Sequence, residues 1–69
     1  MKKTKIGIIG CGAISDHYYR GLSAFRFLEL AGVADMNLER AKTKAGEWNT
    51  RAFSVNDLLA RDDIEIVLN

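Results

Sequence analysis

Short runs of apolar residues alternate with longer amphipathic segments along this chain, and the two patterns predict different elements. Residues 5–9 and 28–35 are predicted to be strands, and residues 5–9 are apolar on both faces, as expected for a strand that helices cover on both sides. Between them, apolar residues in segment 13–27 recur at spacings of three and four, which predicts an amphipathic helix. The apolar positions of that helix are Ile14, Tyr18, Leu22 and Phe25.

The second half of the chain continues this alternation with shorter elements. We predict a helix over residues 38–48, a strand over 51–54, a helix over 55–61 and a strand over 64–68. Asn37 is a good N-cap for the first of these helices, and Ser54 followed by Asp57 resembles a capping box for the second. The order β-α-β-α-β-α-β implies a parallel sheet with right-handed crossovers. We therefore expect an α/β fold, as a fragment of a larger doubly wound domain.

Two glycines, Gly10 and Gly12, separate the first predicted strand from the first predicted helix, within the segment KIGIIGCGAIS. Gly10 permits a tight turn, and Gly12, which has no Cβ, allows a pyrophosphate to approach the backbone. The amino end of the helix then directs its N–H groups and its positive dipole end at that anion. The third glycine of the dinucleotide-binding fingerprint would fall at Ser15, so the motif is G-x-G-x-x-S rather than the complete form.

An acidic residue, Asp35, closes the second predicted strand, 25 residues after Gly10. A carboxylate at this place hydrogen-bonds the adenosine ribose hydroxyls and repels a 2′-phosphate. No arginine stands at Met36 or Asn37 to bind such a phosphate, and Arg40 is one helical turn further along. The sequence therefore favours NAD as the cofactor, with NADP as the alternative. The competing interpretation is that Asp35 is only a turn residue at the end of a strand.

Other residues have structural interpretations. We expect Gly7 to allow close packing beneath the first helix, Tyr18 to lie in the core, and Trp48 to close the second helix. His17 is expected at the helix surface or at a domain interface. The segment RDD at 61–63 is expected to form a solvated turn, without a metal pair.

Charge and composition exclude several classes of function. Ten Lys and Arg residues against nine Asp and Glu residues give a net charge of +1, without the basic stripe of a nucleic-acid-binding protein. Cys11 is the only cysteine and His17 the only histidine, which excludes disulfides and argues against a zinc cage. The apolar run 6–10 is too short for a secretory signal or a membrane span. We therefore expect a cytoplasmic protein with a reduced Cys11 and no membrane partner.

The segments KIGIIGCGAISDHYYRGL, ELAGVADMNLERA and AFSVNDLLARDDIEIVLN, in this order, resemble the start of proteins of the glucose–fructose oxidoreductase and inositol dehydrogenase family. The resemblance covers nearly the whole chain. It implies a Rossmann-type NAD(P)-binding fold, with Gly10, Gly12, Ala13 and Ile14 at the pyrophosphate and Asp35 at the ribose. Family members are NAD(P)-dependent oxidoreductases of sugars, polyols and related compounds. The parent protein is thus expected to transfer a hydride between a nicotinamide cofactor and a small molecule of this kind.

The resemblance also implies that residues 1–69 are a partial dinucleotide-binding domain. The family's nicotinamide-lining Thr-Pro segment, its Glu-Lys-Pro segment with the catalytic lysine, and its substrate domain would all come after Asn69. No catalytic residue is therefore assigned, and the 69-residue chain alone is expected to be inactive. We expect a homo-oligomeric parent. We also expect the fourth strand to form an open apolar edge that makes the isolated piece fragile.

Two other functions remain as alternatives. The glycine turn of methyltransferases that bind S-adenosylmethionine can look like IGCG, but it typically has an acidic residue where Ile8 stands and a glycine where Ile14 stands. A non-catalytic module that senses a dinucleotide would have the same turn and the same acidic strand end. Binding of NAD and NADP distinguishes the first alternative, and turnover of polyols distinguishes the second.

Overall fold

The computed structural model describes residues 3–10 and 12–69. The predicted order of strands and helices is confirmed. The elements are β1 (Thr4–Ile9), α1 (Ala13–Ser23), β2 (Leu28–Ala34), α2 (Leu38–Glu47), β3 (Ala52–Phe53), α3 (Val55–Leu59) and β4 (Ile66–Leu68). The longest helix in these residues, α1, has 11 residues, and none is long and apolar enough to cross a membrane.

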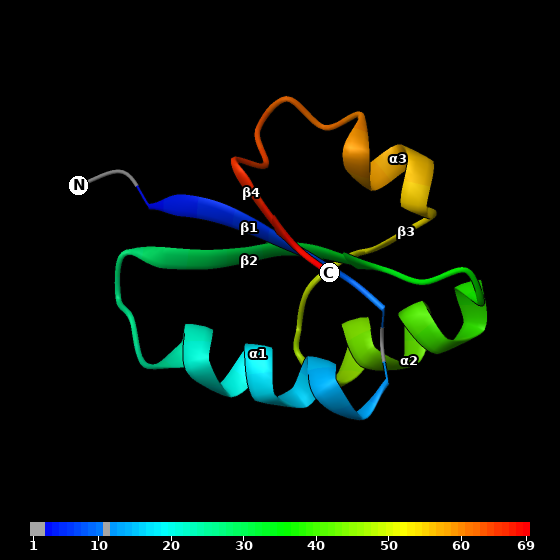
Figure 1. Cartoon of the computed structure of the whole chain (residues 1–69), viewed down its shortest axis with the longest axis horizontal. Helices are drawn as coiled ribbons and strands as arrows, with labels where there is room; N and C mark the ends of the chain where they lie inside the picture. Colours follow the sequence, from blue (N-terminus) through cyan, green and yellow to red (C-terminus); the bar gives the residue numbers. More distant parts are fainter. Residues whose placement is uncertain (1–2, 11) are drawn as a thin grey trace.

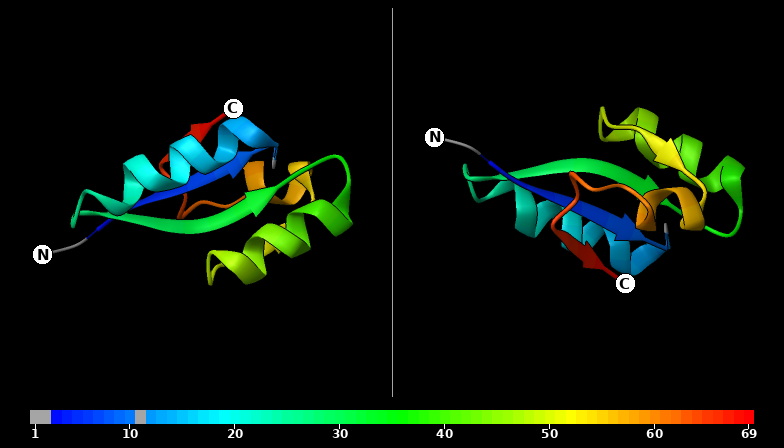
Figure 2. Two further views of the ribbon diagram at one scale, coloured as in Figure 1. Left: turned by 90° about the horizontal axis from the view of Figure 1, so that it is seen from below. Right: turned by 90° about the horizontal axis from the view of Figure 1, so that it is seen from above.

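The strands form one parallel sheet in the order β3-β2-β1-β4. Helices α1 and α2 cover one face of this sheet and α3 lies on the other, as Figure 1 shows and as the views in Figure 2 confirm. The chain therefore winds in both directions from β1, which is the arrangement expected for part of a doubly wound α/β domain. Because all strands are parallel, the carboxyl ends of β1 and β2 lie at the same edge of the sheet.

The main core lies between the sheet and the helices α1 and α2. Ile8 of β1 and Val33 of β2 are fully buried there. Ala41 and Ala45 of α2, one helical turn apart, present small side chains that allow this helix to lie close to the sheet. The alternation of side chains along a strand explains why Ile8 and Ile6 share this face.

An aromatic pair joins the two helices of this layer. The rings of Tyr19 and Trp48 are stacked, with centroids 4.7 Å apart and an interplanar angle of 7°. Trp48 is the C-cap residue of α2 and is only 9% exposed, which confirms that it closes this helix. Tyr18 is half-buried and packs against the core, as predicted, and His17 is exposed on the surface of α1.

The opposite face has a smaller contact in which glycines are required. Leu58 of α3 is fully buried, and a Cβ added to Gly7 would lie 3.1 Å from one of its methyl carbons. A Cβ added to Gly32 would collide with the ring of Phe53. Gly7 therefore allows close packing beneath α3, and our expectation that it lies beneath α1 is wrong. The reason is strand alternation, since the neighbouring Ile6 and Ile8 already occupy the α1 face.

Helix α1 ends at Ser23, earlier than the predicted residue 27. Phe25 N–H donates to Leu22 O at 3.0 Å and Leu28 N–H to Phe25 O at 3.3 Å, so the chain turns tightly before β2. Phe25 and Phe27 are 50% and 53% exposed. The prediction that Phe25 belongs to the buried face of this helix is therefore wrong. The later elements are also shorter than predicted, and β4 begins at residue 66 rather than 64.

The predicted helix caps are confirmed. The Asn37 side chain accepts hydrogen bonds from the N–H groups of Glu39 and Arg40, at 3.1 and 3.3 Å. The Ser54 hydroxyl oxygen accepts one from the N–H of Asp57 at 3.1 Å. Each cap thus satisfies backbone donors that the first turn of a helix leaves without an internal acceptor.

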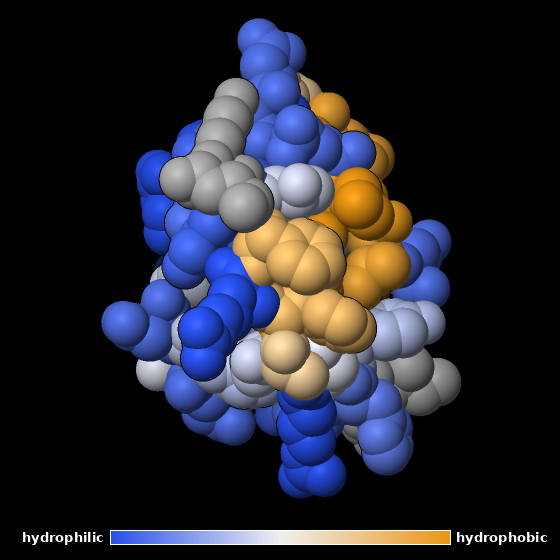
Figure 3. All heavy atoms as spheres, turned by 90° about the vertical axis from the view of Figure 1, so that its left-hand side faces the viewer, coloured by the Kyte–Doolittle hydropathy of each residue, from blue (hydrophilic) through white to orange (hydrophobic). Residues whose placement is uncertain are grey.

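Strand β4 lies at an edge of the sheet, and Ile66 and Val67 are 44% and 38% exposed. The expected open apolar edge is therefore present. Figure 3 shows apolar side chains gathered on the side of the molecule that presents β4 and the turn between α1 and β2. Phe25 and Phe27 are the large exposed apolar residues of that turn.

Candidate functional site

The glycine turn and the acidic strand end lie next to each other. Ile9 and Ala34 are partners in the β1–β2 register, so Gly10 and Asp35 leave neighbouring strands at the same level. The N–H of Gly10 donates a hydrogen bond of 2.8 Å to the carbonyl oxygen of Ala34. In open α/β sheets the ligand crevice lies outside the carboxyl ends of the strands, where this pair stands.

Gly10 adopts a backbone conformation that other residues rarely reach, with φ at +90°. A Cβ added there would have no neighbour within 4 Å, so the requirement for glycine comes from the backbone and not from crowding. This confirms the tight turn predicted at the end of β1.

Gly12 is the N-cap residue of α1 and, as a glycine, it has no side chain of its own to cap this helix end. A Cβ added to Gly12 would also have no neighbour within 4 Å, so the space beside it is open. The backbone of Ala13 and Ile14 forms the first turn of α1, where N–H groups have no acceptor inside the helix. Cys11, which we expected to be a reduced thiol, lies outside the described residues.

Asp35 is half-buried at the end of β2. Its Oδ1 accepts a hydrogen bond of 2.8 Å from the N–H of Asn37, which holds the carboxylate at the edge occupied by the glycine turn. Met36, between these two residues, is 99% exposed. Arg40 lies in the first turn of α2, where its exposed side chain is the nearest candidate in sequence for binding a 2′-phosphate.

An ion pair between helices supports the site and is not visible in the sequence pattern. Lys44 Nζ of α2 lies 3.1 Å from Asp16 Oδ1 in the first turn of α1, and 3.5 Å from Glu47 Oε1. The hydrogen bond with Asp16 raises the pKa of Lys44 above its usual value. The contact links the amino end of α1 to α2. Asp16 and Lys44 are 28 residues apart, so only the folded chain brings them together.

Proteins of known sequence share this region. The chain is 36% identical over 67 residues to inositol 2-dehydrogenase from Gluconacetobacter diazotrophicus, covering 91% of the chain and 20% of that protein. It is 30% identical over 66 residues to L-aspartate dehydrogenase from Methanocaldococcus jannaschii, covering 93% of the chain and 25% of that protein. The chain thus spans a fifth to a quarter of the length of these relatives.

Solved structures share the fold. The WlbA dehydrogenase from Bordetella pertussis, solved with NADH and UDP-GlcNAcA, superposes with a TM-score of 0.86 at 26% identity, over 96% of this chain and 20% of that one. The 3-ketoreductase KijD10 from Actinomadura kijaniata, solved with NADP and TDP-benzene, gives a TM-score of 0.86 at 26% identity, over 96% of this chain and 21% of that one.

A family model described as an oxidoreductase family with an NAD-binding Rossmann fold matches residues 4–68. The match covers nearly every residue of the chain and includes β1, the glycine turn and the acidic end of β2. It confirms the predicted fold class, the family resemblance and the dinucleotide as cofactor. The chain belongs to the glucose–fructose oxidoreductase and inositol dehydrogenase family of oxidoreductases, whose NAD-binding fold it carries.

Proposed function

We propose that this chain is the cofactor-binding part of a dehydrogenase that transfers a hydride between NAD and a sugar, a polyol or a related compound. The observation that carries the proposal is the hydrogen bond from Gly10 to Ala34, since it holds the glycine turn beside Asp35. A turn without charged side chains, adjacent to one carboxylate, has the chemistry to bind a diphosphate and its neighbouring ribose.

In this proposal the backbone does most of the binding. The amides of the first turn of α1, at Ala13 and Ile14, donate to the diphosphate, and the positive end of the helix dipole strengthens these bonds. Gly10 supplies the turn and Gly12 the open space through which a phosphate oxygen reaches the backbone. The residues present therefore fit a dinucleotide.

Asp35 has the second role. Its carboxylate accepts hydrogen bonds from the adenosine ribose hydroxyls and repels a 2′-phosphate, so that NAD binds more tightly than NADP. When bound, the nicotinamide supplies the hydride acceptor or donor, whereas the protein orients it. We assign no catalytic residue within the 69 residues.

The two relatives of known sequence are named for different substrates, inositol and L-aspartate, although the matched regions have similar lengths. This supports a cofactor role for the shared region and a substrate site elsewhere. We infer the sugar or polyol class from the inositol enzyme, which has the higher identity, and from the nucleotide sugar in the WlbA structure. Residues 1–69 would then be a partial dinucleotide-binding domain of a cytoplasmic, homo-oligomeric enzyme whose substrate domain lies outside this chain.

Calorimetric titration with NAD and NADP tests the cofactor site. We expect NAD to bind about tenfold more tightly than NADP, and Asp35→Asn to remove most of this difference. Asparagine retains an oxygen that can accept the Asn37 N–H, so the turn should be preserved. Asp62→Asn is the matched control, because Asp62 is exposed and far from the turn in sequence. Equal affinities for NAD in the wild type and in Asp35→Asn, with the preference unchanged, would contradict the assignment.

Turnover by the intact parent protein separates an enzyme from a dinucleotide sensor. A panel of polyols and sugars is supplied with NAD, and reduction of the cofactor is followed by its absorbance. Reduction with at least one member supports the dehydrogenase. Tight NAD binding without turnover of any sugar, polyol or amino acid would favour the sensor.

A further inference from the structure

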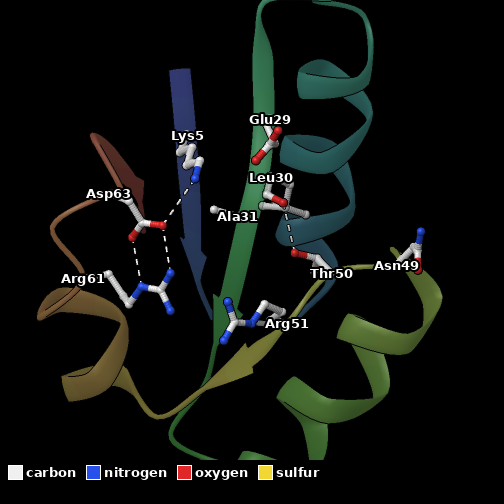
Figure 4. Close-up of a pocket in the computed structure, with 9 residues that line it drawn as sticks. All are labelled: Lys5, Glu29, Leu30, Ala31, Asn49, Thr50, Arg51, Arg61 and Asp63. Atoms are coloured by element: carbon white, nitrogen blue, oxygen red, sulfur yellow. Dashed lines mark hydrogen bonds and ion pairs between the residues drawn. The ribbon is translucent and has the colours of Figure 1, made fainter. Parts of the chain in front are cut away.

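A second hollow, of about 360 Å³, lies away from the glycine turn. Its lining comes from the amino-terminal halves of β1 and β2 and from the loops that precede β3 and β4 (Figure 4). Helix α3 has only five residues, and its Leu58 packs over Gly7 and Gly32, further along the strands. The amino-terminal part of this face of the sheet is therefore left open. Its volume is at the small end of the range for small-molecule pockets.

The charges around this pocket are unequal. Lys5, Arg51 and Arg61 contribute three positive charges, and Glu29 and Asp63 contribute two negative ones, which leaves one positive charge in excess. Asp63 accepts two hydrogen bonds from the Arg61 guanidinium, at 2.9 and 2.8 Å, and lies 3.5 Å from Lys5 Nζ. The Asp63 carboxylate thus forms ion pairs with two of the three cations, Lys5 and Arg61.

Arg51 is the one of these three cations that does not pair with Asp63. In the part of the chain that the structure describes, no carboxylate lies within ion-pair distance of its guanidinium. Its charged group lies 5.3 Å from the centre of the Phe53 ring, and that of Arg61 lies 5.2 Å from the same ring. Figure 4 shows the two guanidinium groups next to each other at the pocket. Because both guanidinium groups lie near the same ring, their like charges repel, and an anion bound at the pocket reduces this repulsion.

One backbone conformation and two hydrogen bonds hold the backbone around Arg51. Asn49 has a φ of +53°, a left-handed conformation that asparagine tolerates. The Thr50 hydroxyl donates to Leu30 O at 3.0 Å, and Val33 N–H donates to Arg51 O at 2.9 Å. Strand β2 has a bulge at Ala31, which has no partner residue in the β1–β2 register, and the two hydrogen bonds lie on either side of it. Such bulges change the direction of side chains and are frequent next to binding sites.

We propose that this pocket binds a phosphate group, with Arg51 as its main ligand and with Arg61 and Lys5 supplying supporting charge. A guanidinium presents a planar fork of donors that matches two phosphate oxygens. The Arg51 fork has no carboxylate partner among the described residues, whereas the Arg61 fork is bound to Asp63 and adds positive charge near the same Phe53 ring. The group is either free inorganic phosphate or the phosphate of a small organic ester, both of which the volume admits. The site is separate from the proposed dinucleotide crevice, which lies at the carboxyl ends of the strands.

Amide NMR titration of the chain, with sodium phosphate added against sodium chloride at constant ionic strength, tests the site. We expect saturable shifts at Lys5, Ala31, Thr50 and Arg51. A parallel titration with glycerol 3-phosphate separates the two sources, because tighter binding of the ester indicates an organic phosphate and tighter binding of the free ion indicates inorganic phosphate. Shifts confined to Gly10 and Gly12, or shifts that spread over the surface without saturation, would overturn the proposal.

Substitutions test the direction in which phosphate affinity changes, in addition to the location of the site. Arg51→Gln should weaken phosphate binding at least about tenfold, since it removes a charge-assisted bidentate contact. Glu29→Gln should strengthen binding, because it removes a carboxylate from the lining. Arg26→Gln, at an exposed arginine of the α1–β2 turn, is the control with the same loss of charge. Equal affinity in Arg51→Gln and Arg26→Gln would overturn the role of Arg51, and amide spectra verify that each variant is folded.

Discussion

The N–H of Gly10 and the carbonyl oxygen of Ala34 are 2.8 Å apart, and this hydrogen bond continues the β1–β2 ladder one residue past the end of β1. It holds the turn in its left-handed conformation beside the residue that precedes Asp35. In our proposal, the stability of the turn depends on Gly10 and its capacity to bind a cofactor on Gly12, so substitutions can separate the two.

Gly10→Ala should destabilise the fold, whereas Gly12→Ser should mainly weaken NAD binding. Alanine at a φ of +90° costs about 1–2 kcal/mol, since a Cβ is strained in this region. Serine at Gly12 is a good N-cap and its Cβ would have open space around it, but it would fill the space that a phosphate needs in our proposal. We expect the free energy of unfolding of Gly12→Ser to be unchanged within about 0.5 kcal/mol. Urea denaturation and calorimetry with NAD measure the two effects.

Two results would contradict these separate roles of Gly10 and Gly12. If Gly12→Ser bound NAD with the affinity of the wild type, the diphosphate would not approach the backbone at Gly12. If Gly10→Ala were as stable as the wild type, the left-handed turn would not be needed for folding.

Local signals allowed the sequence to predict the tight turn at Gly10 and the helix caps at Asn37 and Ser54. Asn37 and Ser54 cap their helices through bonds to residues two or three positions away, so their roles follow from spacing alone. The end of α1 was missed because no glycine or proline follows Ser23 directly, and the tight turn at Phe25 has no composition signal.

The sequence pattern could not predict features that depend on which helix covers which face of the sheet. Gly7 was placed under the wrong helix because strand alternation shows two faces without showing which helix covers each. Residues 62–63 form the predicted turn, but the sequence pattern did not show that Arg61 and Asp63, each one-third exposed, form an ion pair across it. Asp62, between them, is on the exposed side of the turn.

Stability should fall in acid through Asp63. The Arg61 guanidinium, with a smaller contribution from Lys5, holds the pKa of the Asp63 carboxyl well below its usual value of 3.8. A group whose pKa is lowered by folding stabilises the protein above its unfolded pKa, and this contribution is lost as the pH falls below it. The free energy of unfolding, measured in urea from pH 7 to pH 2, should therefore decrease more steeply below about pH 4 in the wild type than in Asp63→Asn.

Asp62→Asn is the matched control for this titration, as its carboxyl is the exposed neighbour. It should follow the wild type over the whole range. A constant difference between the wild type and Asp63→Asn at every pH would show that the ion pair does not contribute through the charge of Asp63.

The open edge at β4 should make the isolated chain associate. Val67 is 38% exposed on the edge strand of the sheet that the described residues form, and a lysine at such a position protects an edge by charge. We expect Val67→Lys to shift the chain toward monomer in sedimentation velocity at concentrations where the wild type associates. Leu59→Lys, at an apolar residue of α3 that is 58% exposed, controls for the loss of apolar surface away from this edge. Equal association of all three proteins would assign the self-contact to another surface.

Glycines in the strands and glycines in the helices should respond to alanine with opposite signs. Gly32 lies beneath the Phe53 ring, so Gly32→Ala forces that ring and Leu58 to move and should destabilise the fold by about 1–3 kcal/mol. Gly46 is exposed in α2 and has open space around its Cβ position, so Gly46→Ala should stabilise the fold by about 0.5–1 kcal/mol. In Gly32→Ala, the further change Phe53→Leu should restore part of the loss, because the smaller side chain leaves room for the new methyl group. Urea denaturation compares the wild type, Gly32→Ala, Gly46→Ala and the double variant. If Gly32→Ala were as stable as Gly46→Ala, the Phe53 ring would not pack over Gly32 of β2.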